Sequence, residues 1–160
     1  MLTARALPVY LWPVVIKAVF KGDLFLLRKY HVAAPCCLSI AVADTYVALR
    51  KHTAPDFVLY GLWDRAMGCW AGMVGAEKES NTLVTFGLGY AYRTREGVAQ
   101  LAEQCCNLRD NRRIAYSGLY DRNVPAARFL TQLGFVPSDT LLTHPLTNQP
   151  GRLFTLEPTP

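Results

Sequence analysis

The sequence predicts a mixed α/β (α+β) fold, in which helices flank a central, mostly antiparallel sheet. Two observations predict it. Between residues 57 and 92, three runs of β-branched and aromatic residues are separated only by short polar turns, which is typical of an antiparallel meander. Before and after the meander, apolar residues recur with the 3.6-residue period of a helix. The length of 160 residues fits one domain, and we expect residues 1–160 to form it.

Composition narrows the class of protein. Apolar residues make up 51% of the chain and charged residues 18%, which excludes wholesale disorder. The net charge of +5 suits an anionic partner, but no Lys/Arg block has the density of a nucleic-acid-binding tail, so nucleic acid is not the expected partner.

The five cysteines are an odd number and include two adjacent pairs, which argues against a secreted disulfide scaffold and against a zinc site. The three histidines are scattered without metal-ligand spacing, and no metal is expected. A reducing cytoplasm is the expected location.

The N-terminal half begins with an apolar run from Leu7 to Phe20. Two prolines and Lys17 interrupt the run, so it is too short and too broken to span a bilayer or to serve as a signal peptide. We expect it to form a core strand or helix, and we expect no transmembrane segment. From Leu38 to Leu49, apolar side chains form a helical stripe that the segment RKHTAPD ends.

The meander is expected to consist of strands at Phe57–Trp63, Cys69–Ala76 and Thr82–Tyr92, with turns at DRAMG and EKESN. The helical period then returns, with Thr94 as a plausible N-cap and Glu96 in the first turn.

The C-terminal part is expected to contain a strand at Arg112–Tyr120, a short helix and a last strand at GRLFTLEP. The short helix has Asn123 as its N-cap, Pro125 in its first turn and Gly134 at its C-terminal cap. Its buried face is expected to comprise Ala126, Phe129, Leu130 and Leu133.

This arrangement resembles the GCN5-related N-acetyltransferases (GNAT), from about Leu38 to the C-terminus. The family motif N-x-x-A-x-x-F/L-Y-x-x-x-G-F is matched by five residues: Asn123, Ala126, Phe129, Gly134 and Phe135. The resemblance implies a divergent GNAT-like acyl-CoA N-acyltransferase fold, of a kind that would be at home in a bacteriophage. It also implies acetyl-CoA as co-substrate and a primary amine, on a small molecule or a protein, as acceptor.

The coenzyme-binding pattern of the family, Q/R-x-x-G-x-G/A, corresponds to a part of YRTREGVA. Gly97 and Ala99 fill its small positions, whereas Thr94 stands at the Q/R position between Arg93 and Arg95. Main-chain N–H groups at a helix N-terminus bind pyrophosphate, and arginines add charge-assisted donors. A solvated helix start with two surface arginines explains the same residues. The expected coenzyme-binding set is Gly89, Tyr90, Arg93, Arg95, Gly97, Val98, Ala99, Asn123 and Phe129.

For catalysis, the resemblance implies an oxyanion donor among the main-chain N–H groups of Gly87–Ala91. It also implies a tyrosine after Phe129 that protonates the leaving thiolate, but Leu130 occupies that position. The tyrosines near the expected sheet edge, any one of which could substitute, are Tyr90, Tyr92, Tyr116 and Tyr120. Tyr90 and Tyr120 are the expected catalytic substitutes, although a half-buried strand aromatic is the simpler explanation of each. The general base is left open, and the candidates are Glu77, Glu79 and Asp121.

Two functions therefore compete. The first is an acetyl-CoA-dependent N-acetyltransferase. The second is a catalytically degenerate GNAT-like module for binding or assembly, such as a bacteriophage accessory or internal virion protein, which would place it in the virion. An unrelated α/β binding protein is a third. A homodimer or an assembly partner would fit exposed apolar residues near the N-terminus.

Overall fold

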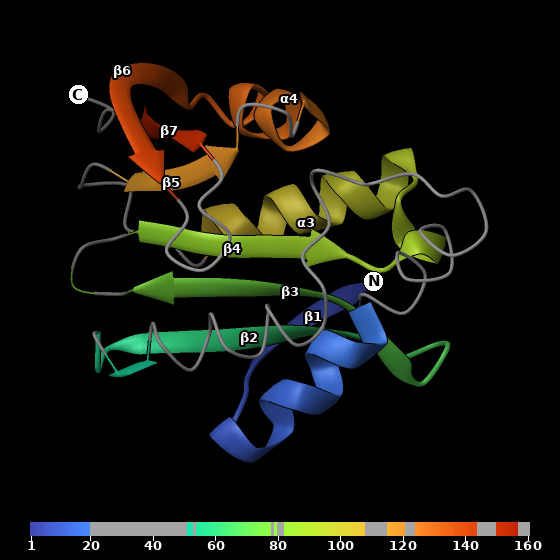
Figure 1. The fold of residues 1–160 in the computed structure, drawn as a ribbon. Helices are drawn as coiled ribbons and strands as arrows, with labels where there is room; N and C mark the ends of the chain where they lie inside the picture. The colour runs from blue at the N-terminus through green and yellow to red at the C-terminus, as the bar shows by residue number, and fades with distance from the viewer. Residues whose placement is uncertain are drawn as a thin grey trace, which may run out of the picture.

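A computed structural model of the chain describes residues 1–19, 51–52, 54–77, 79, 82–107, 115–120, 124–143 and 150–156. Within these residues the strands form two sheets, one of order β1-β2-β3-β4 and one of order β5-β7-β6. Figure 1 shows the two sheets side by side, with β4 next to β5. The mixed architecture with antiparallel sheets and flanking helices confirms the predicted fold class.

The strands are β1 (Leu2–Ala6), β2 (Phe57–Asp64), β3 (Cys69–Glu77), β4 (Thr82–Leu88), β5 (Ala115–Tyr120), β6 (Val136–Thr143) and β7 (Pro150–Leu156). The helices are the 3₁₀ turns η1 (Val9–Leu11) and η2 (Tyr90–Tyr92) and the α-helices α3 (Arg95–Asn107) and α4 (Val124–Gln132), and residues 12–19 and 51–52 are also helical. The predicted helix from Leu38 to Leu49 lies outside the described residues.

The first sheet has an apolar core on each face. Side chains alternate across a strand, and on β3 the neighbours Met73 and Val74 accordingly belong to different core clusters. The same alternation separates Leu59 from Leu62 on β2. Because both faces are covered, β3 is buried over almost its whole length and lacks a polar face.

The N-terminal segment provides the cover for one face. Trp12, Val15, Ile16 and Val19 share one side of the helix at residues 12–19, and all four are buried against the sheet. Pro8 precedes η1, and Pro13 lies in the first turn of the helix, where a missing N–H costs nothing. The expectation that this apolar run forms core is confirmed. No helix among the described residues is long and apolar enough to cross a membrane.

Helix α3 covers the other face, behind the sheet in Figure 1. Leu101 and Cys105 are buried on its inner side, as the helical period predicts. The same apolar cluster includes Phe135, which follows α4, and Phe154 on β7, so one core continues from the first sheet to the second.

Two strands of the structure, β1 and β6, were not predicted from the sequence. Among the described strands β1 pairs only with β2, and it contributes a five-residue ladder whose sequence, LTARA, has little β-forming character. β6 contains Pro137 and, within the described part of the chain, is an edge strand paired with β7 alone, where a proline is tolerated. Both strands exist because a neighbouring strand offers a hydrogen-bonding edge, which the local sequence does not encode.

The prediction that the third meander strand continues to Tyr92 is wrong. β4 ends at Leu88, and residues 90–92 form the 3₁₀ turn η2. Apolar and aromatic character continues through GYAY, so composition gives no sign of the change. Side-chain hydrogen bonds of Tyr92 and Arg93, described below, hold the turn instead.

Candidate active site

The candidate site lies where β4 leads into α3. Gly89 follows the last residue of β4, and its N–H donates to the carbonyl of Ala71 at 2.8 Å. The chain then turns through η2, in which Tyr92 N–H donates to the Gly89 carbonyl at 2.9 Å. The segment between strand and helix is therefore a closed, hydrogen-bonded turn.

Helix α3 begins with a side-chain cap. The hydroxyl of Thr94 accepts from the Gly97 N–H at 3.1 Å, and the Thr94 carbonyl accepts from the Val98 N–H at 2.9 Å. Thr94 is thus the N-cap that the sequence predicts. The cap occupies the Gly97 N–H and leaves the N–H groups of the first two helical residues, Arg95 and Glu96, without a partner inside the helix.

Gly97 is required by the packing of the chain on itself. A Cβ built on this residue would lie 2.0 Å from the carbonyl oxygen of Tyr92, closer than any real contact. The neighbour that comes this close to Gly97 is the main chain of Tyr92. Beside it, Val98 is half-buried on the core and Ala99 is exposed.

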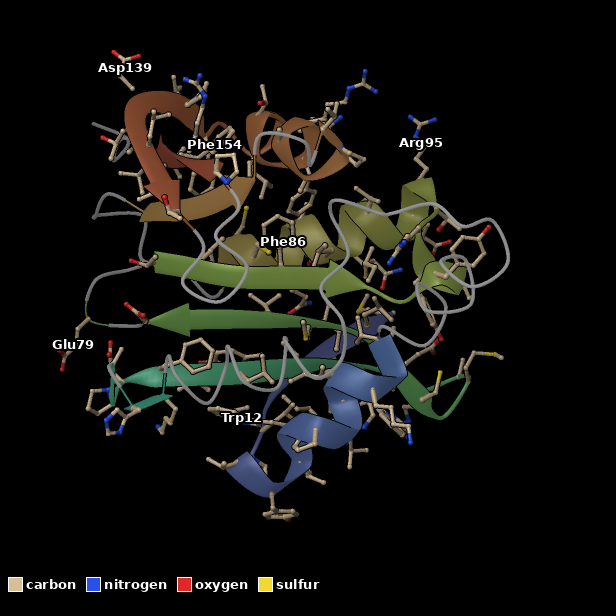
Figure 2. The ribbon with its side chains drawn as sticks, viewed as in Figure 1. Trp12, Glu79, Phe86, Arg95, Asp139 and Phe154 are labelled. Atoms are coloured by element: carbon tan, nitrogen blue, oxygen red, sulfur yellow. The ribbon has the colours of Figure 1, made fainter. Side chains whose placement is uncertain are left out.

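The two arginines of the loop differ in their surroundings. Arg93 folds back, and its Nε donates to the carbonyl of Leu88 at 3.1 Å. Arg95 is exposed and projects away from the sheets (Figure 2). Among the described residues, no hydrogen bond or ion pair of the Arg95 side chain is present. Arg93 therefore stabilises the turn, whereas Arg95 presents a cation to solvent beside the helix N-terminus.

The two tyrosines of η2 also differ. Tyr90 is 58% exposed on the surface of the turn. The Tyr92 hydroxyl donates to Oδ2 of Asp64 at 2.7 Å and lies 3.2 Å from the Cys69 thiol. Burial, and then the contacts with Cys69 and Asp64, raise the pKa of Tyr92 far above its usual value of 10.0. Tyr92 accordingly stays protonated and is a poor acid.

Asp64 is a site-adjacent residue that the sequence reasoning missed. The hydrogen bond from Tyr92, together with the N–H groups of Met67 and Ala66, holds the pKa of Asp64 below its usual value of 3.8. Its position at the head of the turn DRAMG was a signal for the bonds to Ala66 and Met67. No pattern in the sequence pairs it with Tyr92, which lies 28 positions away.

The edge of β4 that faces β5 carries the candidate oxyanion donor. The Gly89 N–H points to β3, because it donates to Ala71. Hydrogen-bonding directions alternate along a strand, so the N–H and carbonyl of Leu88 point to the other edge, and Arg93 indeed reaches the Leu88 carbonyl there. Residues 90 and 91 of the expected range belong to η2, and among the extended residues Gly87–Gly89 alternation selects Leu88. In the described residues no ladder joins β4 to β5, although the strands are neighbours.

The residues of the motif in α4 are core and cap residues. Phe129 is buried with its ring 5.0 Å from that of Phe86 on β4, and Leu130 is fully buried. Gly134 has a φ of 90°, the left-handed conformation of a helix C-terminus, as predicted. Ala126 and Leu133 are only half-buried, so the predicted buried face is narrower than expected.

The remaining candidates are dispersed or undescribed. Glu77 is buried at the end of β3, and Glu79 lies in the following turn, where its N–H donates to Asp56 at 2.7 Å. Tyr120 ends β5, but its side chain lies outside what the structure describes, as do Asn123 and Asp121 entirely. In the part of the chain that is described, no cluster of His, Cys, Asp and Glu could hold a metal ion.

Comparison with solved structures identifies the fold. A protein assigned as a phosphinothricin N-acetyltransferase aligns over 100% of both chains with a TM-score of 0.64 and 14% identity. A protein assigned to the GNAT family of acetyltransferases from Desulfovibrio desulfuricans aligns over 99% of this chain and 100% of its own, with a TM-score of 0.65 and 13% identity. The ribosomal-protein-S5-alanine acetyltransferase of Vibrio fischeri aligns over 98% and 94%, respectively, with a TM-score of 0.58 and 14% identity.

No protein-family model matches the sequence, and no curated protein matches it either. At these identities the likeness shows the fold, which is that of the GNAT acetyltransferases, and so confirms the fold that the resemblance implied.

Proposed function

We propose that this protein is an N-acetyltransferase that transfers the acetyl group of acetyl-CoA directly to a primary amine. The observation that carries the proposal is the capped N-terminus of α3 beside the edge of β4 that pairs with no strand among the described residues, in a fold whose solved neighbours are N-acetyltransferases. The nature of the acceptor, whether a small molecule or a protein, is left to experiment.

The first turn of α3 is the proposed site for the pyrophosphate of acetyl-CoA. Main-chain N–H groups and the positive end of the helix dipole attract an anion there. The N–H groups of Arg95 and Glu96 would donate to it, and the exposed guanidinium of Arg95 adds a charge-assisted donor. Tyr90, Val98 and Ala99 remain proposed contacts of the coenzyme, as do Asn123 and Phe129 on the other side of the site.

The edge of β4 is the proposed site of chemistry. Attack of a neutral amine on the thioester carbonyl creates an oxyanion, for which the Leu88 N–H is the proposed donor. The attacking nitrogen releases a proton to water or to a carboxylate base, collapse breaks the C–S bond, the acetyl group stays on nitrogen, and the thiolate takes up a proton. Tyr90 and Tyr120 are the proposed proton donors, whereas Tyr92 is not, because burial raises its pKa and Asp64 accepts its hydrogen bond.

One observation favours a second function. Leu130 occupies the position of the usual tyrosine of this fold family, and its side chain is fully buried. A chain that has lost its proton donor could keep the fold as a module for binding or assembly, such as a bacteriophage accessory or virion protein. The two functions differ in turnover, and the second does not require acetyl-CoA binding.

Thermal unfolding with and without acetyl-CoA tests the proposal. A ligand at about 100 times its Kd stabilises the native state by about 2.7 kcal/mol. For a domain of this size that corresponds to a rise in Tm of roughly 5–10 °C. An unchanged Tm at millimolar acetyl-CoA would refute the proposed acetyltransferase function. A rise without release of free CoA thiol, across a panel of polyamines, amino acids and protein N-termini, would favour the degenerate module.

Variants of the loop locate the site. Arg95→Ala removes an exposed charge that holds no structural contact among the described residues, so the shift with acetyl-CoA should shrink while the Tm of the free protein stays the same. Lys17→Ala is the matched control, since it removes the same charge from the helix on the opposite face of the sheet. An equal loss of the shift in both variants would indicate a non-specific charge effect.

A further inference from the structure

Tyr92 ties together two parts of the molecule that are distant in sequence. Its hydroxyl donates to Asp64, the last residue of β2, and contacts Cys69, the first residue of β3. These two residues also pair with each other at the end of the β2–β3 hairpin where the turn of residues 65–68 connects the strands. The side chain of Tyr92 therefore fastens η2 to the end of this hairpin.

The backbone of the same residue contacts α3. The Tyr92 carbonyl lies against Gly97 so closely that no side chain fits between them. A displacement of η2 is thus transmitted directly to the first turn of the helix. The buried side chains of α3 already hold the helix on the sheet. The contact between Tyr92 and Gly97 is therefore not needed for packing alone.

We propose that the Asp64–Tyr92 hydrogen bond positions the N-terminus of α3 for the pyrophosphate of acetyl-CoA, an inference that rests on the proposed function. Asp64 and Tyr92 are positioning residues in this scheme: neither touches the ligand. They act through the contact between Tyr92 and Gly97, which sets where the N–H groups of Arg95 and Glu96 lie.

The physical reason is pre-organisation. When only a fraction of the free protein has the competent loop conformation, the apparent Kd rises by the inverse of that fraction. A hydrogen bond to a carboxylate shifts such an equilibrium by about a factor of ten or more. Arg93 still pins the turn from the Leu88 carbonyl, so loss of the tyrosine hydroxyl should raise the Kd about three- to tenfold.

The test compares Tyr92→Phe and Asp64→Asn with the wild type by isothermal titration with acetyl-CoA, well below the Tm of each variant. The double variant should bind about as weakly as Tyr92→Phe alone, and less weakly than the sum of the single effects predicts, because both changes act on the same bond. Tyr10→Phe and Asp139→Asn are the matched controls. Tyr10 is 77% exposed on η1, and Asp139 points into solvent from β6 (Figure 2), so neither should change the Kd.

Amide hydrogen exchange separates positioning from mere stability. In Tyr92→Phe the amides of residues 90–98 should exchange faster, while those of β2 and β3 away from the hairpin end keep their protection. A lower Tm with an unchanged Kd and unchanged exchange at residues 90–98 would overturn the inference, since the bond would then only stabilise the fold.

The two proposals fail in different ways. If the wild type does not bind acetyl-CoA, the proposed function is refuted and the positioning role falls with it. If the wild type binds and Tyr92→Phe binds equally well, the function survives and only the positioning role is refuted.

Discussion

Replacing Gly97 with alanine tests the close contact between η2 and α3. The added Cβ would lie 2.0 Å from the Tyr92 carbonyl oxygen, and real Cβ contacts are essentially never under 3.0 Å, so helix and turn must separate by about 1 Å. At an unobstructed helical position the same change would stabilise the protein by about 1 kcal/mol, because alanine has the higher helix propensity.

The close contact with Tyr92 turns this expected gain in stability into a loss. Overpacking costs about 1–3 kcal/mol. The obstacle is backbone, which cannot rotate aside as a side chain would, so the upper part of that range, about 2–3 kcal/mol, applies. Subtracting the propensity gain of about 1 kcal/mol leaves an expected net loss of about 1–2 kcal/mol. In a domain of this size the loss lowers Tm by roughly 2–8 °C.

Urea unfolding at neutral pH measures the effect, with Gly87→Ala on β4 as the matched control. A Cβ on Gly87 would meet its nearest atom, on Val19, at an ordinary 3.7 Å, so this variant should be as stable as the wild type or slightly more so. If Gly97→Ala proves as stable as the wild type, the contact yields without cost and the turn does not constrain the helix.

Two further predictions follow from buried groups. The pKa of Asp64 in the folded protein lies below its ordinary 3.8, so its contribution to stability is present above that value and is lost as the pH falls through the folded pKa. Asp64→Asn should therefore be less stable than the wild type at pH 7. In urea titrations, the difference in unfolding free energy between the two proteins should narrow as the pH falls below 3.8. Leu130→Tyr should not restore a proton donor, because the side chain of residue 130 is 0% exposed. We expect the free energy of unfolding to fall by about 1–3 kcal/mol, with no gain in the rate of CoA release. A faster reaction would contradict the buried placement of residue 130.

The helical period and the turn chemistry of the chain were sufficient for much of the fold. The core strands β2 and β3, the stop at Gly134 and the cap at Thr94 each depend on residues within one or two turns of chain. Such local preferences act before any tertiary contact forms, and the sequence therefore carries them in full.

The edges of the sheets depended on distant partners. β1 and β6 form because β2 and β7 present unpaired backbone groups, and their own residues would equally suit a loop. β4 stops at Leu88 although its aromatic composition continues, because η2 is held by the hydrogen bond from Tyr92 to Asp64, 28 positions away, in addition to the local bond from Arg93 to Leu88.

In the candidate site, too, local features follow from the sequence, whereas other features depend on tertiary contacts. The sequence alone determined that a capped helix with a glycine and two arginines follows the meander, since caps, turns and charges are local properties of YRTREGVA. Only the tertiary structure decided that Arg93 hydrogen-bonds within the turn while Arg95 faces solvent. It also decided that Gly97 lies against the main chain of Tyr92. It also decided that Leu88 offers its N–H toward β5, because the direction of a backbone group depends on the register with the neighbouring strand.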